Sequence, residues 1–400
     1  KSDDYTVLSN KGAALDSLGR YQNAIDAYAQ ALAIKSDYDV VWANRASAIC
    51  NLGRSYTSYR NLDSHFQIQS IPALQASEPH IAALEEALPH LKQGSVGWGN
   101  LHLWLGKTYV KHSKQQQKPF FYLQEAQRSY LTAFSILGPE KFPEEHLEIL
   151  QGLVRVELTF DNIPAAREYQ KQGRTLFERL RSQKPDHLKP DFERKFASFV
   201  QLEIDLLIGE SNPVSALEQA EFYKNRCLIW ILDRWLDNPE SPESEAIQTL
   251  VQSETALIYW HLSHEQLTTF VLLPHQAQPV VIDADRASQA QKLQSWLGTY
   301  NSEYRSYAGK KVKTEQRSRH PWRLHLKSLL TQLEQILNIE AITKALPVDT
   351  KHIVLIPHRD LHRLPLHTFF PDALTTYLPS AQIGLSLSQQ PPTSALAPLL

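Results

Sequence analysis

Four histidines gather near the end of the sequence, where they could hold a metal ion. They fall within sixteen residues, at His352, His358, His362 and His367. Imidazole is a common zinc ligand, and a zinc site on a helix needs two histidines on one face. Pro357 and Pro365 interrupt any helix here, and no cysteine is close enough in the sequence to complete a ligand set. We therefore expect these side chains to hydrogen-bond within loops, and we predict neither a metal site nor a cofactor.

A basic segment precedes the histidines. Residues 305–327 carry a net charge of +7, with Glu315 as the one acid. Their eight basic residues are Arg305, Lys310, Lys311, Lys313, Arg317, Arg319, Arg323 and Lys327. Tyr307 and Trp322 lie among them, and positive grooves with aromatic platforms hold nucleic acids. We expect a solvated loop between two helices, with nucleic-acid binding as the alternative.

Residues 358–361 read His-Arg-Asp-Leu, the opening of a protein-kinase catalytic loop. A kinase needs an asparagine at position 365, which is Pro365 here, together with a DFG motif and a glycine-rich loop. The sequence has none of these, so this motif does not indicate a kinase.

The two cysteines, Cys50 and Cys227, both lie in segments with helical periodicity. Two cysteines are too few for a disulfide framework and fit a reducing, cytoplasmic compartment. Cys227 is predicted to be a buried small apolar residue. A reactive thiol would need an exposed, electropositive setting, for which Lys224 and Arg226 are the only support.

Composition points to a folded, largely helical chain. The 400 residues are 42% apolar with a net charge of −2, which excludes a globally basic nucleic-acid binder and an acidic disordered chain. Glycine is scarce, at 14 residues, and helix interiors disfavour glycine. The sequence contains no run of about 18 apolar residues, so no membrane span is predicted. The first ten residues lack the apolar core of a secretory signal.

The first 53 residues contain a repeated pattern. Small and aromatic residues occupy the positions that a 34-residue tetratricopeptide repeat uses, at Gly12, Leu15, Gly19, Tyr21, Ala24, Tyr28 and Ala31. A shift of 34 residues places Trp42, Ala46, Ile49 and Gly53 on the same template. We predict a helix pair, 10–18 and 22–34, in which Ala24, Tyr28 and Ala31 are buried.

Helical patterns continue over residues 76–238. The small-and-aromatic pattern returns at Leu105, Gly106, Tyr109, Ala126, Tyr130 and Ala133. Such pairs bury their faces only by stacking, which predicts a solenoid with a concave groove. In the first pair, Ser9, Ala13 and Asp16 would line that groove. The basic clamp that grips a C-terminal carboxylate in some repeats is not evident, because only Asn44 occupies one of its positions.

The pattern changes after the proline- and acid-rich stretch 237–246. Residues 255–263 and 267–274 are rich in β-branched and aromatic side chains and predict a hairpin, with 279–282 as a third strand. Helical patterns follow at 284–300 and 321–338. The apolar run 352–357 predicts a parallel-type strand buried on both faces. Strands alternating with helices predict an α/β domain.

Residues 352–387 carry a family resemblance. A strand, Ile353–Ile356, is followed by Pro357, then by Leu361, the Leu364–Leu366 triplet and finally Pro379-Ser380. This passage resembles the first strand and loop of the CHAT domain, a caspase- and separase-like cysteine peptidase fold. Residues 254–273 also look like the hairpin that opens such domains, and tetratricopeptide repeats often precede them.

The resemblance implies an α-helical, tetratricopeptide-like solenoid followed by part of a caspase-like α/β domain. The expected ranges are repeats at 1–60, further helical repeats at 61–245 and the front of the CHAT domain at 250–400. The family's catalytic histidine follows a later strand, in a His-Gly context, and its cysteine lies later still. No His-Gly dipeptide occurs in the sequence. We therefore expect both catalytic residues after Leu400 and assign none here.

The function implied is that of a cysteine endopeptidase whose histidine activates a thiolate. The helical repeats would bind a protein partner and restrain the peptidase until that partner binds. The alternative is a non-catalytic scaffold, including an accessory of a nucleic-acid-guided defence complex, and no membrane is expected as a partner.

Overall fold

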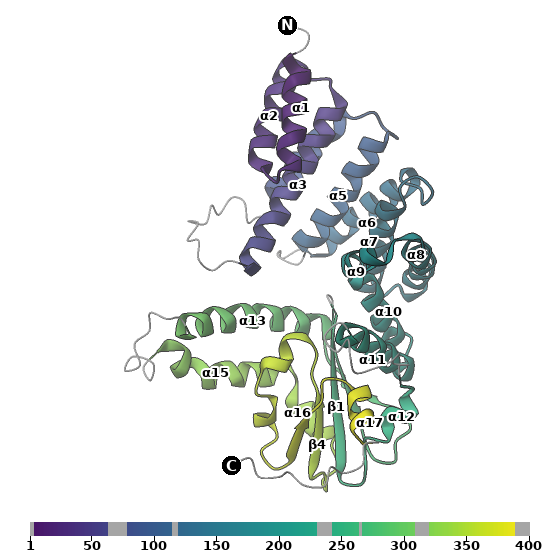
Figure 1. Ribbon diagram of the computed structural model, residues 1–400, viewed down its shortest axis with the longest axis vertical. Coiled ribbons are helices and arrows are strands. Elements are labelled where there is room, and N and C mark those ends of the chain that lie inside the picture. Colours follow the sequence, from purple (N-terminus) through teal and green to yellow (C-terminus); the bar gives the residue numbers. More distant parts are fainter. Residues whose placement is uncertain are drawn as a thin grey trace. The chain divides into compact units, whose positions relative to one another are not determined.

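The computed structural model describes residues 4–62, 78–113, 119–229, 242–263, 266–308 and 320–388. The chain divides into two compact units, Lys1–Arg194 and Lys195–Leu400. The first unit is helical, and the second builds a five-stranded sheet with helices on both faces (Figure 1). A helical part followed by an α/β part is what the sequence predicts.

The first unit is a succession of helices, each packed on the next. Its helices are α1 (Asp4–Ser17), α2 (Tyr21–Ile34), α3 (Asp39–Leu62), α4 (Glu78–Ala87), α5 (Val96–Ser113), α6 (Pro119–Ile136), α7 (Pro143–Thr159), α8 (Ile163–Gln183) and α9 (Lys189–Lys195). Helices also contact the next but one, as α1 does α3 and α5 does α7. Prolines in the first turns of α7 and α8 favour those starts, since the missing N–H has no helical partner there.

Glycines facing tyrosines set how closely the helices approach. Gly12 of α1 lies against the ring of Tyr28 on α2, where a methyl carbon would come within 2.5 Å of Cε1. Ala24, Tyr28 and Ala31 are each at most 1% exposed, so the predicted helix pair and its buried face are confirmed. Small side chains here let the backbones close around one large ring.

The same contact recurs further along the chain. Tyr130 of α6 lies against both Gly106 of α5 and Gly152 of α7, and it is 3% exposed. Ala126 and Ala133, on either side of it, are fully buried. The small-and-aromatic pattern therefore predicts the packing correctly in this second place.

The predicted groove residues of the first pair differ from expectation in detail. Ser9 is 7% exposed, and the Asp16 carboxylate accepts a weak hydrogen bond from Asn51 at 3.4 Å. Ala13 is exposed. Of the three positions, Ala13 alone is open to a partner, because Ser9 faces the neighbouring helices.

The second unit contains a mixed sheet in the order β3-β2-β1-β4-β5. The strands are β1 (Thr255–Leu262), β2 (Leu267–Leu272), β3 (Val280–Val281), β4 (His352–Ile356) and β5 (Leu374–Tyr377). β1 and β2 pair antiparallel, whereas β4 runs parallel to both β1 and β5. The predicted hairpin and the predicted parallel central strand are therefore confirmed.

Helices cover the two faces of this sheet separately. One layer consists of α10 (Ala197–Gly209), α11 (Pro213–Ile229), α12 (Ser244–Gln248) and α17 (Ala381–Ser388); the other consists of α13 (Arg286–Ala308), α15 (Pro321–Ile336) and α16 (Ile339–Ala345). Ile353 and Leu355 of β4 face the second layer, and Val354 and Ile356 face the first. Burial on both faces explains why this strand is a continuous apolar run.

The boundary between the units lies earlier than the acidic stretch 237–246 indicates. α10 and α11 pack on the sheet, where Leu217 and Ala220 contact the same apolar cluster as Tyr259 and Phe270. The sequence ranges 61–245 and 250–400 therefore do not coincide with the compact units. Residues 230–241 lie outside the described part of the chain.

Candidate functional site

The carboxyl ends of β1 and β4 lie together at one edge of the sheet, because the two strands are parallel. Ligands of α/β sheets bind at this edge, outside the ends of parallel strands. His261 lies at the end of β1, and Pro357 and His358 directly follow β4. α11 packs against these residues and brings Lys224 to them.

The two histidines stack on each other. Their ring centroids are 4.9 Å apart and their planes differ by 19°. His358 Nδ1 accepts a hydrogen bond of 2.9 Å from the backbone N–H of Leu262, so that nitrogen carries no proton. Neither ring nitrogen of His261 has a hydrogen-bond partner in the described part of the chain.

Both stacked rings are neutral at pH 7. Burial, together with the positive charges of Lys224 and Arg359, lowers the pKa of His261 to about 3. Burial also lowers the pKa of His358 well below its ordinary value, with His261 and Lys224 contributing. The pair is a stacked, desolvated contact that a proton would disrupt.

Lys224 is the buried cation of this site. Its Nζ donates a hydrogen bond of 2.8 Å to the carbonyl oxygen of Pro357 and lies 4.0 Å from the centroid of the Tyr259 ring. Burial lowers its pKa to about 7, and the Glu221 carboxylate opposes that shift. At neutral pH this amine can therefore both hold and release a proton.

Glu221, one turn earlier on α11, is the matching anion. Its Oε1 accepts a hydrogen bond of 2.8 Å from the backbone N–H of Gln382, in the first turn of α17. Burial raises the pKa of Tyr259 well above its ordinary value, and Glu221 raises it further. One face of α11 thus binds the end of β4, the middle of β1 and the start of α17.

A second buried carboxylate holds the β1–β2 turn. Ser263 Oγ donates a hydrogen bond of 2.8 Å to Oδ2 of Asp205, which α10 supplies. Ser263 Oγ also accepts from the backbone N–H of Gln266 at 2.8 Å. Helices α10 and α11 therefore fix both chain segments that leave this edge of the sheet.

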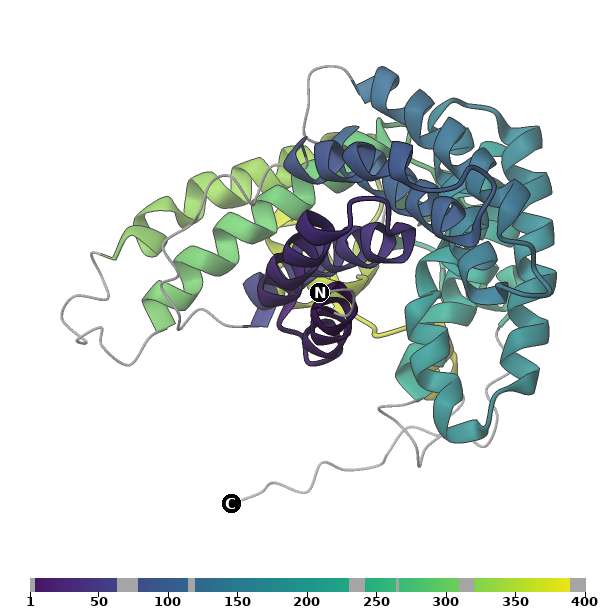
Figure 2. The same ribbon diagram turned by 90° about the horizontal axis from the view of Figure 1, so that it is seen from above.

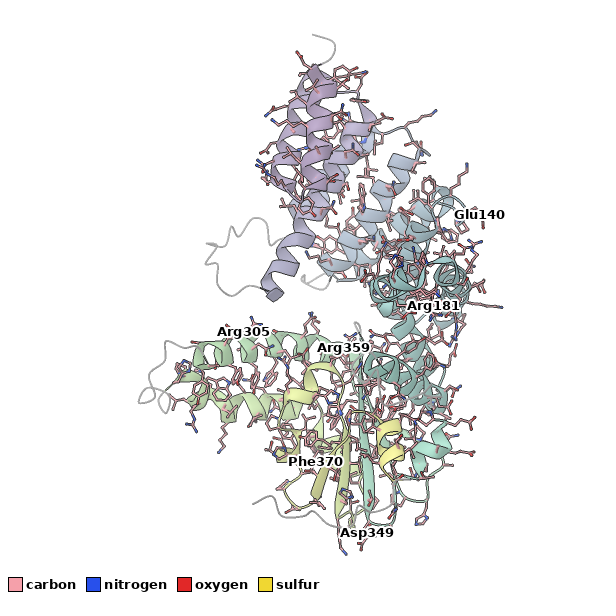
Figure 3. All side chains as sticks on the ribbon, viewed as in Figure 1. Glu140, Arg181, Arg305, Asp349, Arg359 and Phe370 are labelled. Atoms are coloured by element: carbon pink, nitrogen blue, oxygen red, sulfur yellow. The ribbon has the colours of Figure 1, made fainter. Side chains whose placement is uncertain are left out.

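The segment after β4 folds over the edge in two short 3₁₀ turns, Arg359–Arg363 and Leu366–Phe369. Its leucines anchor it in the core under α13 and α15: Leu361 and Leu366 are fully buried, and Leu364 is 4% exposed. Arg359 has a positive φ of 54° and an exposed side chain (Figure 3). The leucines thus hold the segment against the second layer, and Lys224 of the first layer binds Pro357 at its start.

The four histidines of the sequence cluster do not form one group, because His352 and His367 bond elsewhere, although His362 is near enough to His358 to lower its pKa. His352 Nε2 bonds to Thr376 Oγ1 at 2.9 Å, and the backbone N–H of His367 donates to the hydroxyl of Tyr377 at 2.8 Å. Within the described ranges no three or more histidine, cysteine or acidic side chains are close enough to hold a metal ion. Asp360 of the kinase-like motif pairs with Arg363, its neighbour on the 3₁₀ turn.

Several residues of this site are not evident from sequence. His261 sits inside an apolar strand, and Lys224 and Glu221 lie three positions apart on a helix that reads as amphipathic. One signal in the sequence could have revealed them: Glu221 and Lys224 share a helix face with Leu217 and Ala220, whose apolar side chains must be buried. Cys50 and Cys227 lie on α3 and α11, and their side chains fall outside the described part of the structure.

The helical unit offers a separate candidate, a hollow of about 420 Å³ between α7 and α8. Glu140 and Arg179 form an ion pair of 3.0 Å at its rim, and Lys171 and Glu168 also line it. His146 is in its wall, with Nδ1 at 2.7 Å from the carbonyl oxygen of Leu137. Balanced charges and an open shape suit a polypeptide better than a small charged ligand.

No protein-family model matches this chain, and no curated protein matches it at a significant level. Of the helices that the structure describes, none combines the length and the apolar character needed to span a membrane.

Proposed function

We propose that this chain is a protein-binding helical-repeat module of tetratricopeptide type, joined to the front part of a caspase-like cysteine endopeptidase domain. The observation that carries the proposal is the recurring contact between helical glycines and a buried tyrosine, Gly12 with Tyr28 and Gly106 and Gly152 with Tyr130. This contact is what the tetratricopeptide template requires of its small and aromatic positions. Repeats of this kind present their remaining helix faces to a partner.

The second unit supports the peptidase half of the proposal by its topology. An antiparallel hairpin is followed by a parallel strand, and a proline-containing loop leaves that strand at the carboxyl edge. The CHAT resemblance places the catalytic histidine and cysteine on elements later in the chain than this sheet. The histidine would act as the base for a thiolate that attacks a peptide carbonyl, in a reducing, cytoplasmic compartment.

One observation favours a scaffold role instead. The carboxyl edge, where an α/β enzyme binds its ligand, is filled here by Lys224 and the stacked pair His261 and His358. In the described part of the chain, no hydroxyl or thiol bonds to either histidine. This sheet would then position other elements and perform no chemistry itself.

The binding half can be tested by placing a photo-crosslinking amino acid on either helix of the first pair. Ala13 of α1 and Ala29 of α2 are both exposed alanines, so they form a matched pair. We expect the variant at Ala13 to give one dominant protein adduct in lysate, and the variant at Ala29 to give little. Equal adducts at the two positions would contradict a partner groove on the first helices.

The peptidase half needs a separate test with the protein as its gene encodes it, including any residues after Leu400. An irreversible cysteine-peptidase probe should label one cysteine beyond residue 400, identified by mass spectrometry. Labelling confined to Cys50 or Cys227, or to no cysteine, would favour the scaffold.

A further inference from the structure

The helices α13 and α15 form a hairpin in the second unit (Figures 1 and 2). Aromatic rings form a row along its far half, which comprises the end of α13 and the start of α15. The first half of α13 packs on the sheet through Leu293, Trp296 and Leu297. Beyond it, Tyr300, Tyr304 and Tyr307 continue the same face, because residues four and three apart share one side of a helix. Tyr300 still packs against the core of the second unit, whereas Tyr304 is exposed, so burial does not account for its aromatic ring.

The rings contact one another in a continuous row. Tyr300 and Tyr304 are parallel within 6°, with centroids 6.4 Å apart. Trp322 of α15 stacks on Tyr307 at 4.7 Å and meets Tyr304 edge-on at 5.3 Å. Tyr304 is the accessible ring of this row, at 45% exposure, whereas Tyr300, Tyr307 and Trp322 are half-buried. A rigid, partly exposed π surface is a platform on which a flat base can stack.

Basic side chains flank this platform, and the acid beside it, Glu303, lies 3.5 Å from His325 across the hairpin. Arg305, Arg323 and Lys327 are exposed on the same two helices, and Figure 3 shows Arg305 on the far part of α13. The sequence adds charge of the same sign between the helices: the chain's net −2 comprises +7 within residues 305–327 and −9 elsewhere. The chain is thus acidic outside this segment, and Arg305, Arg323 and Lys327 of the segment lie on the same two helices as the aromatic row.

We propose that the far half of the α13–α15 hairpin binds single-stranded nucleic acid. Bases would stack on the exposed face of Tyr304 and its neighbours, and Arg305, Arg323 and Lys327 would contact phosphates. Single strands are favoured over duplexes because their bases are free to stack. They are favoured over an acidic protein segment because Asp and Glu side chains offer no flat ring that could stack on Tyr304 and its neighbours. This surface is separate from the groove and from the edge of the sheet.

Fluorescence anisotropy with the 400-residue chain tests the proposal. A labelled 20-nucleotide dT strand should bind with a dissociation constant of about 1–100 µM at physiological salt, and a 20-base-pair duplex more weakly. Tyr304→Ala should weaken binding roughly 5- to 100-fold, whereas Tyr304→Phe, which keeps the ring, should bind like the parent. Arg305→Glu should flatten the dependence of affinity on salt, because about one fewer phosphate contact is made.

The control is Lys292→Glu, an exposed charge reversal on the same helix but outside the aromatic row. It should change the affinity less than Arg305→Glu does. Circular dichroism of each variant confirms that the hairpin remains folded. The proposal is overturned if the dT oligonucleotide does not bind, or if Tyr304→Ala binds it like the parent. It is also overturned if polyglutamate of equal charge competes for the labelled dT as well as unlabelled dT does. The last result would indicate a surface for acidic proteins.

Discussion

Replacing Gly152 by alanine would test how the first unit is packed. A methyl carbon there would lie 2.6 Å from Cε2 of Tyr130, about 1 Å inside an ordinary carbon–carbon contact. The ring has little room to move, because Gly106 of α5 also lies against it; a methyl carbon there would come within 2.7 Å of Cε1. Two helices therefore approach one ring at distances that glycine alone permits.

The expected cost follows from two opposing terms. Alanine in a helix interior gains up to about 1 kcal/mol over glycine, and overpacking a core costs about 1–3 kcal/mol. We expect Gly106→Ala and Gly152→Ala to lower the free energy of unfolding of this region by about 0–2 kcal/mol. Gly97→Ala is the matched control on α5, since its methyl carbon would lie 3.6 Å from the nearest carbon, Cβ of Ala43. That variant should be neutral or slightly stabilising.

Hydrogen exchange of the α5, α6 and α7 amides is the assay, because two compact units need not unfold as one. Protection of these amides from exchange should be lower in Gly106→Ala and Gly152→Ala than in Gly97→Ala. Combining Gly152→Ala with Tyr130→Leu should cost less than the sum of the two single changes, since a smaller side chain makes room for the methyl group. Protection in Gly106→Ala that equals or exceeds that in Gly97→Ala would refute the reasoning.

Three further predictions concern the second unit. Because burial lowers the pKa values of His261 and His358, the unfolded chain binds protons below pH 6.5 that the folded chain does not. The free energy of unfolding should therefore fall by up to about 1.4 kcal/mol per pH unit for each histidine, and a flat urea-denaturation profile between pH 7 and 5 would contradict this. Lys224→Met should cost about 3 kcal/mol by leaving the Glu221 carboxylate buried without its cation, and adding Glu221→Gln should recover part of that loss in calorimetry. The 400-residue chain should leave peptide libraries uncut, and cleavage abolished by Cys227→Ala would show that this cysteine is catalytic.

Local patterns predicted the elements of both units because each pattern reports which side chains must be buried. Ala24 and Tyr28 indicated a helix pair, and both are buried in it. The apolar run 352–357 indicated a strand covered on both faces, and β4 is such a strand. In the helix pair the spacing of the buried residues indicates the element, whereas in 352–357 the shortness of the run and its β-branched residues indicate a strand.

The surface on which each helix packs was less predictable than the helix itself. Helix α11 carries small residues at Ala216 and Ala220, as the repeats do, so periodicity cannot tell whether Leu217 and Ala220 face a helix or a sheet. The site at the sheet edge was not predicted for the same reason. His261, Lys224 and Pro357 meet only after the whole unit has assembled, and nothing in their local sequence records that meeting.

The contacts of α11 bear on how the protein folds during synthesis. Lys224 and Pro357 are separated by 133 positions, and Glu221 and Gln382 by 161. The glycine–tyrosine pairs of the first unit span far shorter separations, so its hairpins can form while the chain is still being made. α11 emerges next. Lys224 stays exposed to water until Pro357 is made, 133 residues later, and Glu221 until Gln382 is made, 161 residues later. The completion of this unit is therefore timed by the appearance of α17, and a pause in translation before residue 382 would leave the apolar face of α11 open to chaperones.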